Sequence, residues 1–105
     1  MTLAIDSGIE NKVSQLAVQV ADEAHRRFGN NIPVYWFGSW VNGNASNRSD
    51  LDIGVDVSSS VLTSDFLNFV DWVEALPTLY RFDVINMSEI SDSFRSKIKT
   101  MGRLL

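Results

Sequence analysis

Two extended segments joined by a polar loop constrain this chain more than any other part of its sequence. The first, Val34–Phe37, is apolar and β-prone, and it runs directly into Gly38 and Ser39. The second begins at Asp50, and from there apolar and polar residues alternate. A period of two predicts a strand with one polar face and one buried face, the latter formed by Leu51, Ile53, Val55 and Val57.

The polar face of the second segment carries two aspartates, Asp50 and Asp52, spaced i, i+2. On a strand they emerge from one face about 7 Å apart, so both carboxylates can reach one hard cation. Mg²⁺ is typically held by one or two carboxylates together with phosphate oxygens and water. Gly38 lets backbone N–H groups approach an anion, and the Ser39 hydroxyl lies beside those donors. The pattern predicts metal ligands on the second segment and a phosphate-binding turn at the end of the first.

The remaining elements are predicted from periodicity and from the residues that end or cap helices. Apolar residues at helical spacing predict three helices, of which the first ends at Gly29, the second is capped by Thr63 or Ser64, and the third begins near Ser91. A third strand is predicted over residues 79–85. The order α-β-β-α-β-α around one core predicts a two-layer α/β or α+β domain.

Length and composition narrow the function classes. With 105 residues, the chain is expected to form one domain, residues 1–105. Its net charge of −4 argues against a nucleic-acid binder with a broad basic surface, because phosphate neutralisation supplies most of that affinity. No apolar run reaches the roughly 18 residues of a membrane span, and the N-terminus lacks a basic region followed by an apolar stretch. We therefore expect a cytoplasmic protein, and the absence of cysteine fits a reducing compartment.

The strand, turn, loop and Asp-x-Asp strand resemble the minimal nucleotidyltransferases, small members of the DNA polymerase beta-like superfamily. The family pattern is met by Gly38, Ser39, Gly43, Ser49, Asp50 and Asp52. The resemblance implies the nucleotidyltransferase fold, a small mixed sheet flanked by helices. It also implies a third acidic residue on a neighbouring strand. Asp83, which interrupts the apolar stretch 79–85, falls where that residue would be.

The resemblance also implies roles for these residues. The catalytic and metal-binding residues would be Asp50, Asp52 and Asp83, with two Mg²⁺ ions expected. The residues that bind the nucleotide, ATP, would be Gly38, Ser39, Gly43, Ser49 and Arg48. Surface solubility explains Arg48 equally well. Three carboxylates that converge without a cation would repel one another and raise their pKa values, and a bound divalent ion removes that problem.

The implied function is transfer of AMP from ATP to a tyrosine of a helical HEPN-type toxin, with this chain as the antitoxin of the pair. Family members often carry basic residues between the two glycines, whereas this chain has Trp40, Val41 and Asn42. This departure favours an alternative, a non-catalytic nucleotide-binding subunit that neutralises its partner by complex formation. A nucleotidyltransferase acting on an antibiotic hydroxyl is a further alternative, and it would need an acceptor pocket built by a homo- or hetero-oligomer.

Several other side chains near these elements have two interpretations. Trp40 could stack on a nucleobase or pack over the motif loop. The basic residues of the last helix are most simply a solvated face, although positive charge near a triphosphate could help. They are Arg95, Lys97, Lys99 and Arg103.

Overall fold

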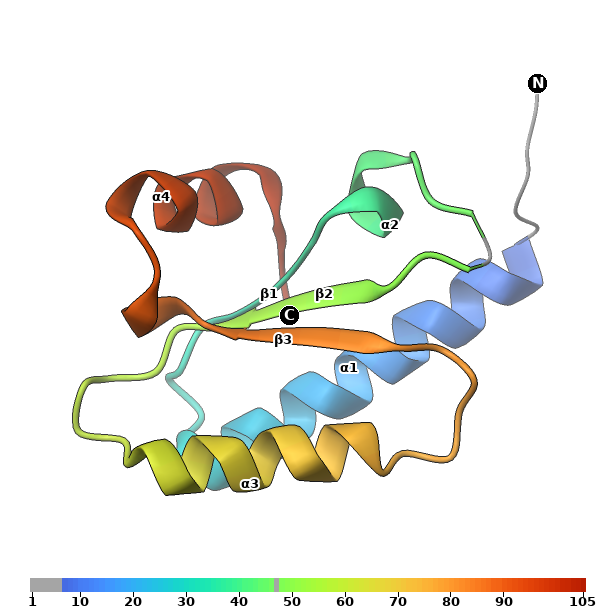
Figure 1. Cartoon of the computed structure of the whole chain (residues 1–105). Coiled ribbons are helices and arrows are strands. Elements are labelled where there is room, and N and C mark those ends of the chain that lie inside the picture. The colour runs from blue at the N-terminus through green and yellow to red at the C-terminus, as the bar shows by residue number, and fades with distance from the viewer. Residues whose placement is uncertain (1–6, 47) are drawn as a thin grey trace.

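The computed structural model describes residues 7–46 and 48–105, and its elements follow the predicted order with additions (Figure 1). The elements are α1 (Ser7–Phe28), β1 (Val34–Phe37), α2 (Ser39–Asn42), β2 (Leu51–Val55), α3 (Thr63–Glu74), β3 (Phe82–Asn86), the 3₁₀ turn η1 (Met87–Glu89), α4 (Asp92–Met101) and β4 (Arg103–Leu104). The predicted α-β-β-α-β-α order is therefore confirmed. The sequence did not predict α2, η1 and β4.

The four strands form one mixed sheet in the order β3-β2-β1-β4. β1 pairs antiparallel with both β2 and β4, and β2 pairs parallel with β3. The parallel pair requires a crossover connection, which α3 supplies. Because α3 spans one face of the sheet, β3 returns beside β2 with its residues in register, Asp52 opposite Asp83.

The helices divide between the two faces of the sheet. In Figure 1, α1 and α3 lie together under one face, and α4 and the short α2 lie over the other. The core lies between the sheet and the first pair of helices. It contains Val13, Ala17 and Val20 of α1, Leu51, Ile53 and Val55 of β2, and Phe66, Phe69 and Val73 of α3.

Aromatic packing closes the core at the end of α1. The Phe28 ring stacks on Phe66 at 6.0 Å between centroids and meets Phe69 edge-on at 5.5 Å. Phe69 is fully buried, and burial of a side chain of this size stabilises a fold by about 1.5–3 kcal/mol. Gly29 ends α1 as predicted. Its φ of +116° is a conformation that favours glycine, and its N–H donates to the His25 carbonyl.

Two predicted boundaries differ from the structure. β3 begins at Phe82 rather than at residue 79, because Leu79 is fully exposed and the Tyr80 N–H donates to the Thr78 hydroxyl. The N-cap of α3 is Leu62 rather than Thr63 or Ser64, and no side chain caps that end. α4 begins as predicted: the Ser91 hydroxyl accepts a hydrogen bond from the Phe94 N–H.

The C-terminal strand β4 adds an edge that the sequence pattern does not show. Its two residues pair with Tyr35 and Trp36 of β1. The Arg103 guanidinium lies over the Trp36 ring, 5.1 Å from its centroid, a favourable cation–π geometry.

In the described part of the chain, no helix has the length and apolar character needed to span a bilayer.

Candidate functional site

Asp52 and Asp83 lie next to each other on adjacent strands. They are register partners in the parallel β2–β3 ladder, so their backbones are about 4.8 Å apart and their side chains share a face. The neighbouring residues Leu51 and Ile53 are fully buried against α1 and α3. Alternation therefore directs both aspartates to the opposite face of the sheet, which carries α2 and α4 (Figure 1).

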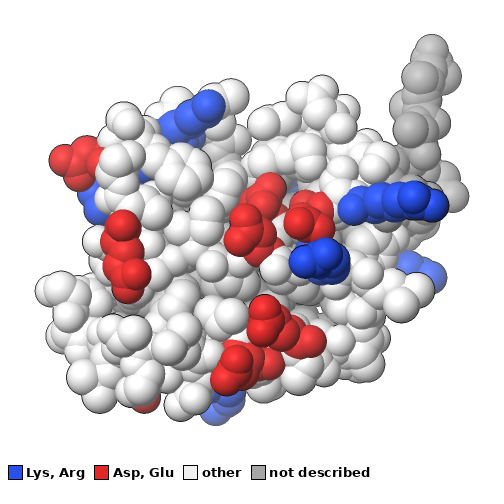
Figure 2. Space-filling view, viewed as in Figure 1, with Lys and Arg blue, Asp and Glu red and all other residues white. Residues whose placement is uncertain are grey.

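The charge on this face is concentrated. Figure 2 shows acidic side chains gathered in the middle of the face over β2 and β3, with basic side chains beside them toward the starts of these two strands, at the right of the view. Burial, together with the nearby carboxylates of Asp83 and Asp50, raises the pKa of Asp52 to about 6. Asp50 and Asp83 are exposed, whereas Asp52 is half-buried. The structure thus brings all three predicted carboxylates into one electrostatic cluster.

Gly38 lies directly against the Asp52 carboxylate. A Cβ atom added to Gly38 would be 2.0 Å from Oδ2 of Asp52, far inside van der Waals contact. The backbone of Gly38 is also in a region that favours glycine, with φ of +86°. In the antiparallel register Asp52 pairs with Phe37, so Gly38 is the first residue beyond the pair. The predicted phosphate turn and the predicted metal ligands are therefore in contact.

The residues after Gly38 form the short helix α2 instead of an extended loop. The N–H groups of Val41 and Asn42 both donate to the Gly38 carbonyl. The helix ends at Gly43, which is left-handed at φ +80°, and the Asn44 N–H donates to the Ser39 carbonyl. The two glycines of the motif thus have separate conformational roles, one at each end of α2.

Trp40 links α2 to the segments that lead into β2 and β3. Its indole N–H donates to the Ser49 carbonyl over 2.9 Å, and its ring meets Tyr80 edge-on at 6.1 Å. Ser49 in turn holds the loop, because its hydroxyl accepts from the Ser46 N–H at 2.9 Å. Of the two interpretations of Trp40, these contacts support packing over the loop.

A Trp40→Phe variant tests this contact. It keeps an aromatic ring but leaves the Ser49 carbonyl without its indole donor, and we expect the free energy of unfolding to fall by about 1–2 kcal/mol. Urea denaturation measures that fall. Loosening of the loop should also increase amide hydrogen exchange at Ser49 and Asp50. Unchanged stability and exchange would show that the hydrogen bond does not hold the loop.

The two arginines near the acidic cluster are both exposed. The Arg81 carbonyl accepts from the Leu51 N–H at 2.8 Å, which continues the ladder one step and places Arg81 across from Asp50. Arg48 lies in the loop before β2, and its backbone N–H donates to the Ser46 hydroxyl. Both cations belong to the strand-entry side of the site.

The donor set has the chemistry of a magnesium site. Asp50, Asp52 and Asp83 offer only carboxylate oxygens, the ligands that Mg²⁺ prefers, and their mutual repulsion is the kind that a cation relieves. Within residues 7–46 and 48–105, no three acidic or histidine side chains are already placed to hold one ion together. The assignment of these three residues as ligands therefore stays a prediction.

A cavity that the sequence pattern does not indicate lies beside Gly38. It has a volume of about 190 Å³ and lies between β1, α2 and α4, where Lys97 is one of its lining residues. Nothing in the local sequence pattern connects Lys97 with Gly38, because they are far apart along the chain. Only the position of α4 over β1 brings them to one place.

The sheet topology, the acidic pair and the adjoining glycine turn define a nucleotidyltransferase type of α/β domain. Sequence comparison agrees: the family described as "Polymerase beta, Nucleotidyltransferase" matches residues 20–105. The chain belongs to this family. No curated protein matches the chain significantly.

Solved structures share the fold. A minimal nucleotidyltransferase has a TM-score of 0.73 at 20% identity, and the match covers 91% of this chain and 95% of that one. A chain of a toxin–antitoxin complex with AMP-PNP has a TM-score of 0.63 at 17% identity, covering 82% and 69%. A nucleotidyltransferase from Sulfolobus solfataricus has a TM-score of 0.62 at 20% identity, covering 92% and 82%. At these identities the likeness shows the fold alone.

Proposed function

We propose that residues 1–105 act as a minimal nucleotidyltransferase that transfers AMP from ATP to a hydroxyl of a partner protein. The observation that carries this proposal is the contact between the Gly38 turn and the Asp52–Asp83 pair. A turn that accepts an anion and a pair of carboxylates that accepts a cation are in direct contact. A nucleoside triphosphate with its metal has both charges in one ligand.

In this proposal Asp50, Asp52 and Asp83 hold Mg²⁺, with two ions expected. When bound, Mg²⁺ would neutralise charge that develops on the phosphates and lower the pKa of the attacking hydroxyl. Backbone N–H groups of the Gly38-Ser39 turn bind the phosphates.

The remaining predicted residues support the nucleotide. Gly43 and Ser49 shape the loop that follows the turn, and Arg48 is a candidate phosphate contact at its exposed end. In the transfer, the acceptor oxygen forms a bond to the α-phosphorus, and the bond to the bridging oxygen breaks so that pyrophosphate leaves. With Asp83 as a metal ligand, the hydroxyl proton goes to solvent water; in the alternative in which Asp83 is the general base, the proton goes to its carboxylate.

We further propose that the acceptor is a tyrosine of a helical HEPN-type toxin and that this chain is its antitoxin. Two fold neighbours support a protein partner. One is from the toxin–antitoxin complex with AMP-PNP described above. The other, at a TM-score of 0.57 and 17% identity over 90% of this chain and 70% of that one, is from the toxin–antitoxin pair MntA–HpeT. The latter is a mutant with two aspartate-to-glutamate substitutions two positions apart, the spacing of Asp50 and Asp52.

The test is label transfer to a candidate toxin. The chain is incubated with a small helical protein encoded beside its gene, Mg²⁺ and ATP labelled in the α-phosphate. We expect an AMP adduct on a tyrosine of that protein, located by mass spectrometry, and no adduct with EDTA or with Asp52→Asn. Absence of both label transfer and complex formation would contradict the proposal.

One observation favours a second candidate, a non-catalytic subunit that neutralises its partner by complex formation. Trp40, Val41 and Asn42 bring no positive charge to α2, and Trp40 is held by Ser49 and Tyr80. The same experiment separates the two functions. A stable complex without label on the toxin, while ATP and Mg²⁺ still bind, would establish the non-catalytic role.

A further inference from the structure

The cavity beside Gly38 joins the phosphate turn to α4. Its lining includes Phe37, Gly38, Asn42, Phe94, Lys97 and Met101. Phe37 and Phe94 form its apolar part, with their rings edge-on at 6.1 Å. The lining residues that carry polar groups are Gly38, through its backbone, Asn42 and Lys97. A ligand on the Gly38 turn would therefore lie at the mouth of a cavity with one cation in its wall.

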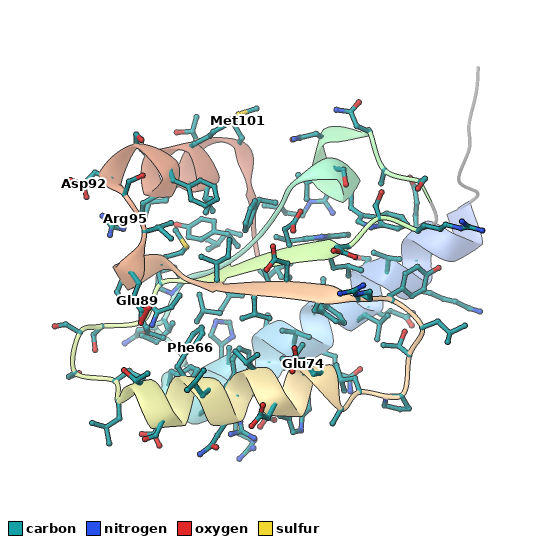
Figure 3. All side chains as sticks on the ribbon, viewed as in Figure 1. Phe66, Glu74, Glu89, Asp92, Arg95 and Met101 are labelled. Carbon is teal, nitrogen blue, oxygen red and sulfur yellow. The ribbon has the colours of Figure 1, made fainter. Side chains whose placement is uncertain are left out.

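The other cations of this C-terminal region are already engaged. Arg95 donates to Asp92 at 2.6 Å and to the Met87 carbonyl at 2.9 Å. Figure 3 shows Arg95 and Asp92 at the outer end of α4 and Met101 at the end nearer α2. Among the described residues, Lys97 takes part in no ion pair, which sets it apart from its neighbours on the helix.

Lys99 and Arg103 are engaged as well. The Lys99 ammonium is 3.2 Å from Oδ2 of Asp56, just beyond the end of β2. The Arg103 guanidinium lies over the Trp36 ring. Lys97 is thus the member of this basic run that lines the cavity, and the run is not a uniform solvated face.

A cation at this position would offset negative charge at the site. The chain has a net charge of −4, and three carboxylates gather next to Gly38. A polyphosphate that approaches the turn would meet repulsion, which the uncharged residues of α2 do not offset. Arg48 and Arg81 lie at the entry of β2 and β3, and α4 lies over β1. Positive charge for the α4 side can come from Lys97.

We propose that Lys97 binds the phosphate chain of the nucleotide and supplies from α4 the positive charge that residues 40–42 lack. The proposal rests on the proposed function, because it assumes that a nucleotide binds at the Gly38 turn. It adds a phosphate-contacting residue from a helix outside the motif.

Calorimetric titration with two probes tests this role. ATP with Mg²⁺ and inorganic tripolyphosphate with Mg²⁺ are each titrated into wild type and Lys97→Gln. We expect Lys97→Gln to raise the Kd for both probes about tenfold, the effect of losing one charge-assisted hydrogen bond. Lys97→Arg should restore binding to within about threefold, since it keeps the charge. Higher ionic strength should weaken wild type more than Lys97→Gln, because salt screens the lost attraction.

Lys99→Gln is the matched control. It removes the same charge from the same helix two residues away, but the partner of Lys99 is Asp56. We expect its Kd for both probes to stay within about twofold of wild type. If wild type binds neither probe, the proposed function fails and this inference fails with it. If wild type binds and Lys97→Gln binds equally well, the role of Lys97 is wrong and the proposed function stands.

Discussion

Gly38→Ala is expected to abolish Mg²⁺-dependent ATP binding and to lower the free energy of unfolding by about 2–3 kcal/mol. Two effects combine. A residue with a Cβ is disfavoured at φ +86°, and that Cβ would be 2.0 Å from Oδ2 of Asp52. The Asp52 side chain is flexible enough to turn away, which relieves the contact but moves the carboxylate from its place beside Asp83. Calorimetry measures the loss of ATP binding, and urea denaturation measures the loss of stability.

Gly29→Ala is the control for this experiment. Gly29 has a positive φ of +116°, but an added Cβ would meet nothing within 4 Å, and the residue lies at the end of α1. The variant should lower stability by about 1–2 kcal/mol through backbone conformation alone and leave ATP binding intact. Full ATP binding by Gly38→Ala would contradict the contact between the turn and Asp52.

A double-mutant cycle separates the two effects at Gly38. In an Asp52→Ala background the carboxylate is gone, so Gly38→Ala should lower stability only by the backbone contribution, similar to that of Gly29→Ala. An equal loss of stability in both backgrounds would show that the carboxylate does not limit this position.

Asp52→Asn is expected to reduce nucleotidyl transfer about a thousandfold and at the same time to stabilise the metal-free protein. Transfer falls because the half-buried carboxylate in the centre of the cluster is lost, and metal-ion catalysis is worth several kcal/mol. Stability rises because the amide removes a charge that burial, Asp83 and Asp50 all disfavour. Label transfer and urea denaturation in EDTA measure the two effects.

The pH dependence of stability gives the size and sign of the stabilisation expected for Asp52→Asn. The pKa of Asp52 rises from 3.8 to about 6 in the folded protein, so the folded state holds this proton more tightly than the unfolded chain. The contribution to stability is therefore present below pH 3.8 and lost as pH rises through about 6. A shift of this size corresponds to about 3 kcal/mol, which solvent screening reduces to about 1–2 kcal/mol.

The difference in free energy of unfolding between wild type and Asp52→Asn isolates the titration of Asp52 from those of the other acids. The stability advantage of the variant should be about 1–2 kcal/mol at pH 7.5 and should decrease as the pH falls from about 6 toward 4. Asp56→Asn is the control, since Asp56 pairs with Lys99 outside the cluster. It should retain transfer and change stability by less than about 1 kcal/mol. Retained transfer in Asp52→Asn would rule out its catalytic role.

Local sequence patterns predicted the elements that have a strong period or a clear cap. Helical spacing and Gly29 located α1, and the Ser91 cap located the start of α4. Strict alternation located β2 and assigned Asp52 to the face opposite Leu51. These features depend on contacts between residues close in sequence or on a period that the sequence displays directly.

Other elements could not be predicted because their stability comes from distant partners. β4 has only two residues and exists because Tyr35 and Trp36 offer an open edge. The start of β3 is set by pairing with Leu51 and by an exposed turn at Leu79, where apolar composition alone suggested a strand. Such pairings carry little local signal, so propensity misplaces their ends.

The sequence by itself determined the family, the order of the main elements and the acidic candidates, because spacing in a strand fixes which side chains share a face. Tertiary structure decided which of these groups meet. Parallel pairing placed Asp83 beside Asp52, and the turn after β1 brought Gly38 against the same carboxylate. The packing of α4 over β1 added Lys97 to the cavity beside that turn. These contacts join residues far apart in the chain, and only the folded sheet with its helices determines them.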